Sequence, residues 1–287
     1  MADTQGTIHG QKFSRNIMPL AQQKESKLYD AVYKEDVTGV KKFVQDQIGV
    51  WTMQQVNGRA PATPENDPLF GRRWGNVYDY HDNRILGRED KLKILSDPAS
   101  MMTKSASGAI GRQIDDTIID AALGTAYYGE TGSSSIALPS AQKIANGSTG
   151  MTVAKFLATS RIFDDANVEM DDRYMVMHPK GKEDLLGDAK ATSADYVNIR
   201  NLVAGNIDTF YGFKIIYSTR LPVVTTVTSA FAFQRYGLML GEQGGAFVRT
   251  SERDDKSYMW QVYYAINHGA VRLEDSRVVQ VDCYRAA

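Results

Sequence analysis

The chain is poor in cysteine. Cys283 is the only cysteine among 287 residues, so neither an intrachain disulfide nor a zinc site built on thiolates can form. This usage is typical of proteins made in a reducing compartment. We therefore expect the chain to be made in a cytoplasm.

Long apolar runs are also absent. The N-terminal segment MADTQGTIHGQKFSRN is polar and lacks the hydrophobic core of a signal peptide. The longest apolar stretches, such as residues 221–224, are far too short to span a bilayer. We therefore expect no membrane partner.

Neither charge sign is in excess. Lys and Arg total 33 and Asp and Glu total 34, which leaves a formal net charge of −1. Tight nucleic-acid binding needs a surplus of basic residues, so we expect any DNA contact to be weak and non-specific. A near-neutral chain also tolerates self-association, because little charge repulsion keeps the copies apart. The 43% of apolar residues is typical of a globular protein and excludes global disorder.

Common catalytic motifs are missing as well, including the glycine-rich nucleotide loops, the zinc-protease motif and the nucleophile elbow. The four histidines are scattered without ligand spacing, so we expect no catalytic residue, no cofactor and no metal site. Asp116 and Asp120 are one helical turn apart and could bind a cation in a metal-assisted hydrolase. The simpler interpretation is a solvated or subunit-facing helix surface neutralised by Arg112.

The first 56 residues combine an irregular segment with weak periodic patterns. Residues 1–20 have no period and predict a mobile arm. Apolar residues at helical spacing predict a helix over 22–47, interrupted at Gly39. Residues 50–56 have the composition of a strand.

A proline-rich stretch follows. Residues 57–73 contain three prolines and no periodicity, and 74–81 alternate like a strand. Together they predict that 50–90 is a long two-stranded excursion with a proline-rich tip. An isolated hairpin is marginally stable in water, so this one needs a surface to lie on.

The clearest helical pattern follows Pro98. Apolar residues recur every three or four positions up to Gly124, which is a typical stop signal. We predict one nearly continuous helix over 99–123. Its apolar stripe, Ile110, Ile114 and Ile118, is expected to pack on a sheet.

The remaining chain alternates short helices with strands. Residues 129–150 predict loops with short strands, 152–167 and 179–187 predict helices, and 173–178 and 210–218 predict strands. From residue 231 onward the pattern is mostly strand, with Gly241, Gly244 and Gly245 expected in a turn between two strands. The predicted class is α+β without internal repeats.

Four passages, taken in order, resemble the major capsid proteins of tailed bacteriophages with the Hong Kong 97-type fold. Residues 90–129 resemble the family's passage from the base of the extended loop into the spine helix. The other three passages are RYMVMHPKGKEDLLGD (173–188), FYGFKIIYSTRLP (210–222) and YYAINHGAVRLEDSRVVQVD (263–282).

The resemblance implies a division of the chain into known parts. These are an N-terminal arm (1–49), an extended β-hairpin loop (50–90), a peripheral domain with the spine helix (91–130), an axial domain (131–230) and returning strands that end in the peripheral domain (231–287). It also implies hexamers and pentamers in an icosahedral virion shell, assembled in the host bacterial cytoplasm. A portal occupies one vertex of such a shell, double-stranded DNA fills it, and a decoration protein is an optional addition.

The residues add detail to this expectation. Arg and Trp are frequent interface anchors, so Arg72, Arg73 and Trp74 of the loop are expected to contact a neighbouring subunit. Some family members link a Lys to an Asn covalently, but residues 57–74 contain no Lys, so we do not expect that link here.

Some family members carry a scaffolding domain ahead of the arm, and we expect none here. We therefore expect a separate scaffolding protein and an arm that is retained in the mature shell. An encapsulin-like nanocompartment shell is the alternative with the same fold.

Overall fold

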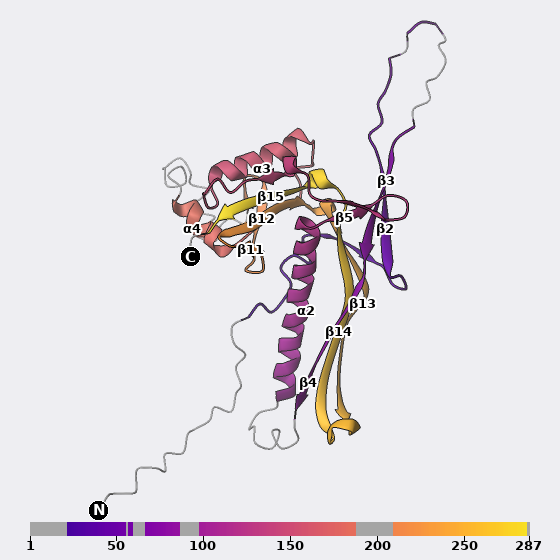
Figure 1. The fold of residues 1–287 in the computed structure, drawn as a ribbon, viewed down its shortest axis with the longest axis vertical. Coiled ribbons are helices and arrows are strands. Elements are labelled where there is room, and N and C mark those ends of the chain that lie inside the picture. Colours follow the sequence, from indigo (N-terminus) through magenta and orange to yellow (C-terminus); the bar gives the residue numbers. More distant parts are fainter. Residues whose placement is uncertain (1–21, 56, 60–66, 87–97, 188–208, 286–287) are drawn as a thin grey trace, which may run out of the picture.

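The computed structural model describes residues 22–55, 57–59, 67–86, 98–187 and 209–285. Three sheets and several helices make up this part of the chain, and the predicted α+β class is confirmed. Figure 1 shows a rounded body, a long helix and long strands that descend from it, and a hairpin that projects on the opposite side. The expected arm, residues 1–20, lies outside the described residues. Within them, no helix has the length and hydropathy needed to cross a membrane.

The rounded body is built on a seven-stranded sheet. Its order is β7-β15-β12-β8-β10-β9, and β11 pairs with β12. Helix α3 (Val153–Asp165) covers the sheet, and the rings of Phe156 and Phe163 pack against Phe213. The strands are β7 (Lys143–Ile144), β8 (Arg173–Met177), β9 (Thr209–Phe210), β10 (Phe213–Tyr217), β11 (Val223–Val224), β12 (Val227–Gln234) and β15 (Val278–Tyr284).

A four-stranded sheet forms the descending part. Its order is β1-β13-β14-β4, and helix α2 (Pro98–Leu123) packs along β14 and β13 (Figure 1). Its strands are β1 (Tyr33–Asp36), β4 (Tyr78–Leu86), β13 (Leu238–Arg253) and β14 (Met259–Arg272). The long β13–β14 hairpin and α2 together give the molecule its elongated shape.

The third sheet carries the projecting hairpin. Strands β2 (Lys42–Ile48) and β3 (Phe70–Asn76) pair in antiparallel fashion, and β5 (Ala126–Tyr128) and β6 (Ser134–Ile136) extend the sheet at its base. The described residues also form four short 3-10 helices. They are η1 (Ser140–Gln142), η2 (Arg235–Gly237), η3 (Asp254–Lys256) and η4 (Asp275–Arg277).

The helices follow their sequence signals. Helix α2 begins at Pro98 and ends before Gly124, whose N–H donates to the carbonyl of Asp120 at 2.8 Å. Thr152 caps α3 by accepting from the amide of Lys155. Helix α4 (Pro179–Gly187) begins at the predicted proline. These three predictions are confirmed.

The predicted helix over residues 22–47 is wrong. Residues 25–32 form bends and turns, followed by β1 and β2. Leu28 and Val32 are fully buried, but they reach the core from turns that are held by the Asp115 carboxylate. The predicted break at Gly39 is confirmed, since its φ of +87° lies in the left-handed region that favours glycine.

The strand pairing around the projecting hairpin also differs from the prediction. Residues 51–55 form no strand, and the first hairpin strand is β2 instead. The alternating segment 74–81 belongs to two strands that meet at Val77: β3 pairs with β2, whereas β4 joins the descending sheet beside β14. The domain boundaries stay predictions.

The expected glycine turn near residue 244 is also wrong. Strand β13 continues through Gly241, and its register with β14 shifts between Gln243 and Phe247. Gly244 and Gly245 have φ values of +66° and +72°, so the pair forms a bulge inside one long strand. Glycines within a strand pattern can mark either a turn or a bulge, and here the continued pairing of β13 with β14 shows a bulge.

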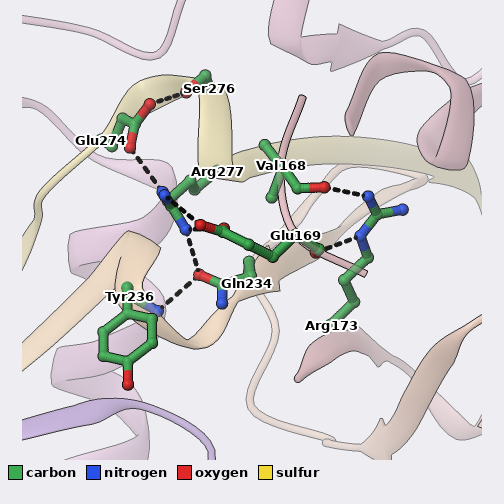
Figure 2. Close-up of polar contacts among 8 residues, drawn as sticks. All are labelled: Val168, Glu169, Arg173, Gln234, Tyr236, Glu274, Ser276 and Arg277. Carbon is green, nitrogen blue, oxygen red and sulfur yellow. Dashed lines mark hydrogen bonds and ion pairs between the residues drawn. The ribbon is translucent and has the colours of Figure 1, made fainter. Parts of the chain in front are cut away.

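A charged cluster links the body to the descending sheet, where the chain crosses between them (Figure 2). Arg277 of η4 donates to the carboxylates of Glu274 and Glu169 and, at 2.8 Å, to Oε1 of Gln234. Gln234 ends β12, just before the chain enters β13, and Arg277 lies between β14 and β15. One guanidinium therefore holds both crossovers between the two sheets.

Candidate assembly surfaces

The base of the projecting hairpin is tied to its own chain. Nη2 of Arg73 donates to Oδ2 of Asp275 at 2.7 Å, and the Arg73 side chain is only 12% exposed. Nε1 of Trp74 donates to the carbonyl of Gly129 at 2.6 Å. Arg72 is more exposed and pairs with Asp46 across the hairpin. All three predicted contact residues thus have a partner within their own chain, and contact with a neighbour stays a prediction.

A buried arginine lies beneath this base. Arg272 at the end of β14 is fully buried, and its Nε donates to Oδ1 of Asp275 at 2.6 Å. Its remaining nitrogens donate to three backbone carbonyls, those of Ala122, Gly124 and Ile136. A cation at the C-terminal end of α2 is favourable because unpaired carbonyls and the helix dipole leave negative charge there. Asp275 therefore joins the hairpin base to the end of the long helix.

The distal part of the hairpin is apolar and uncovered. Val50 is 93% exposed, Trp51 is 69% exposed and Met53 is fully exposed. We call the following set of exposed side chains the apolar loop surface: Ile48, Val50, Trp51, Met53, Leu69 and Phe70. A monomer in water has no reason to display so many large apolar groups on one projection, so the surface indicates a protein contact.

The sequence prediction missed this surface. Residue type favours Arg72, Arg73 and Trp74 as contacts, whereas the composition of residues 50–56 predicts a strand. The sequence does contain a signal for this surface. The apolar residues of the 50–56 run and Leu69-Phe70 flank a proline-rich segment, and residues on such an excursion project away from the hydrophobic core.

The stripe of the long helix lies against the descending sheet. Ile114 and Ile118 are buried in the main hydrophobic core, and Ile110 is partly buried against it. Next to Ile118 on the same helix, Oγ1 of Thr117 lies 3.0 Å from Nε2 of His268, a fully buried residue of β14. Burial lowers the pKa of His268 to about 4, so the imidazole is neutral at neutral pH.

The acidic face of the same helix is organised differently from the prediction. Asp115 is fully buried, and its carboxylate accepts from the side chains of Gln23 and Ser26 as well as from two backbone amides. Asp116 forms a bidentate pair with Arg220. Arg112 instead donates to Gln22 and to the carbonyl of Gln23. The predicted neutralisation of the acidic face by Arg112 is therefore wrong.

This arrangement also bears on the hydrolase alternative. Both oxygens of Asp116 are engaged by one guanidinium, which leaves the carboxylate poorly placed to bind a cation together with Asp120. Among the described residues, no three His, Cys, Asp or Glu side chains group as metal ligands would.

Comparisons with known proteins place these surfaces in a family context. A family model described as phage capsid protein matches residues 6–285. The capsid structure of the cyanophage P-SCSP1u superposes with a TM-score of 0.76 at 15% identity, over 97% of this chain and 94% of that one. The capsid of Ralstonia phage GP4 gives 0.74 at 12% identity, over 100% and 98%.

The capsid of the cyanophage Pam1 is also similar. It gives a TM-score of 0.70 at 13% identity and covers both chains in full. No curated protein sequence matches. The structural similarities establish the Hong Kong 97-type fold predicted from the sequence.

Proposed function

Because the chain belongs to the phage capsid protein family and is a capsid shell protein, we propose that its copies assemble as hexamers and pentamers into an icosahedral shell around double-stranded DNA. The role is structural and non-enzymatic. Assembly takes place in the host bacterial cytoplasm, and the finished shell is part of the virion.

The observation that carries this proposal is the apolar loop surface. Its residues belong to the β2–β3 hairpin, which projects from the body in Figure 1. The base of this hairpin is fixed by the hydrogen bonds of Arg73 and Trp74. A rigid base and an uncovered apolar projection suit a contact with a second copy, because the contact buries area without reorganising the subunit. We infer that residues 48–53 and 69–70 lie on a neighbouring subunit.

Other partners follow from the assembly problem. Similar subunit contacts permit several shell curvatures, so a separate scaffolding protein selects one during assembly. A portal occupies one vertex, and a decoration protein is an optional outer addition. With a net charge of −1, the shell contacts its genome weakly and in a salt-dependent way.

Shortening the hairpin tests the proposal. Gly49 and Leu69 are joined by a backbone hydrogen bond of 2.7 Å, so an Asn-Gly turn can replace residues 50–68 while β2 and β3 stay paired. We expect a folded subunit with native circular dichroism that forms no capsomers in size-exclusion chromatography and no particles in negative stain. Normal shells from the shortened chain would contradict the proposed role of the hairpin.

Expression of the full chain alone tests the need for scaffolding. We expect capsomers, aberrant particles or mixed sizes, because nothing else in the preparation selects the curvature. A uniform population of correctly sized shells would show that the chain sets its own curvature. A small, stable oligomer that never forms capsomers would contradict the shell function itself.

A further inference from the structure

An aromatic groove lies beside the hairpin base. It has a volume of about 180 Å³ and lies between the C-terminal half of α2 and the bend from β3 to β4. Its walls include Trp74, Tyr78, Tyr80 and Tyr127, and one acidic side chain, Asp120, lines it. Tyr78 and Tyr127 are 55% and 43% exposed, so the groove is open to an incoming group.

No described residue neutralises the charge in this groove. The carboxylate of Asp120 has no hydrogen bond or ion pair with any described residue, and partial burial together with the nearby Asp116 raises its pKa. Arg272 also lines the groove, but its guanidinium is already held by Asp275 and three backbone carbonyls. The guanidinium of Arg220 is likewise paired with Asp116. The groove therefore presents one free carboxylate among aromatic rings.

Such a groove suits a cationic side chain. Aromatic faces attract a guanidinium or ammonium group, and a carboxylate adds a charge-assisted hydrogen bond. Arginine fits better than lysine because its planar group stacks on rings while its edge binds the carboxylate.

The projecting loop offers one such group. Arg59 is the only basic residue between Gly49 and Leu69, and it is exposed with no partner among the described residues. The hairpin strands β2 and β3 lead away from the body in Figure 1, and Arg59 lies in the segment between them, whereas the groove lies at the hairpin base. The side chain that complements the groove is therefore presented to a second copy.

We propose that Arg59 of one copy docks in the groove of a second copy, between its Tyr78 and Tyr127 and against its Asp120. This inference rests on the proposed function and adds a defined receiving site to it. The apolar loop surface supplies contact area, and the arginine sets the position of the hairpin on its neighbour.

A charge exchange tests the pairing. Arg59→Glu and Asp120→Arg alone should each reduce the yield of capsomers or particles at least tenfold, and the double variant should restore most of it. Both positions are exposed, so neither change buries a charge, and melting temperatures should stay native. Arg249→Glu, at an exposed arginine of β13 that lies outside the groove and the loop, is the matched control and should assemble normally. Normal assembly of both single variants, or no recovery in the double variant, would overturn the pairing.

Cross-linking provides a direct second test. Two differently tagged full-length chains, one with Arg59→Cys and one with Asp120→Cys, are co-expressed and mildly oxidised. We expect a disulfide-linked dimer that carries both tags. Cys283 does not interfere, because it is buried and burial raises the pKa of its thiol to about 11.

The outcomes of this test are distinguishable from failure of the shell function. Assembled particles without the mixed dimer would overturn the groove contact and leave the shell function standing. Chains that stay monomeric without any substitution would contradict the shell function. A mixed dimer of Arg249→Cys with Asp120→Cys, at equal yield, would show random collision and would also overturn the contact.

Discussion

The two ends of the β2–β3 hairpin differ in how their side chains are covered and bonded. At the base, Arg73 and Trp74 are bonded to Asp275 and Gly129 of the same chain. At the tip, Trp51 and Met53 contact water. The side chains of Arg73 and Trp74 thus have polar partners within the subunit, whereas the large apolar side chains of the tip have no cover from it. We infer that the base stabilises the monomer and that the tip stabilises the proposed assembly.

The strongest test of the base concerns the helix packed beneath it. Ile114→Asp would place a carboxyl group in the main core, where Ile114 is 7% exposed. Burial of an unpaired carboxyl shifts its pKa by about 3–5 units, which corresponds to roughly 4–7 kcal/mol. We expect the subunit to become insoluble or to unfold at very low urea concentration.

Ile110→Asp is the matched control, one turn away and only partly buried. It should cost clearly less free energy of unfolding. Equal losses, or soluble and correctly assembled Ile114→Asp particles, would show that the stripe does not hold the helix to the sheet.

Removal of the buried guanidinium should have the next largest effect. Arg272→Met keeps the side-chain length but leaves Asp275 and three carbonyls short of a donor. Breaking a buried ion pair costs about 3–5 kcal/mol, and urea denaturation of the soluble subunit measures it. Arg249→Met at an exposed position should change the midpoint little. An Arg272→Met subunit as stable as the native one would remove the argument for a rigid base.

The sequence predicts only part of the structure at this base. Helix α2 follows from signals close together in sequence, namely Pro98, the apolar stripe and Gly124. The partners of Asp115 and Arg73 come from positions distant in sequence, which periodicity does not reveal. Residue type alone does not decide the role of Arg73 or Trp74, because an arginine or a tryptophan suits an intramolecular network as well as an interface. Leu28 is buried in the observed turn and would equally be buried on the apolar face of the predicted helix. Its apolar character therefore does not distinguish the two structures.

Acidification should weaken the subunit through His268. Its folded-state pKa of about 4 lies below the ordinary value of about 6.5, so the unfolded chain takes up the proton first as the pH falls. Stability present at neutral pH is therefore lost between about pH 6.5 and 4, by roughly 3 kcal/mol. Urea midpoints measured across this window should fall.

His268→Gln separates this contribution from those of the carboxylates. The variant has no titrating ring, so its urea midpoint should decline less between pH 7 and pH 4.5. Parallel declines in both proteins would mean that other groups carry the acid sensitivity.

The smallest expected effect on the subunit separates the two ends of the hairpin most sharply. Trp51→Ser and Trp74→Ser are the same substitution at the tip and at the base. Trp74→Ser removes a hydrogen bond to Gly129 and a half-buried ring, at a cost of about 2–3 kcal/mol. Trp51 is 69% exposed, so its replacement should change the free energy of unfolding by less than about 0.5 kcal/mol.

For assembly we expect the opposite order, with Trp51→Ser the more damaging variant. A large aromatic side chain at an interface contributes about 2 kcal/mol or more to binding. Urea denaturation of monomers and light scattering of assembling subunits, run on both variants, measure the two effects separately. If Trp51→Ser destabilises the monomer as much as Trp74→Ser, or leaves assembly unchanged, the tip is not an interface and the contrast between the two ends fails.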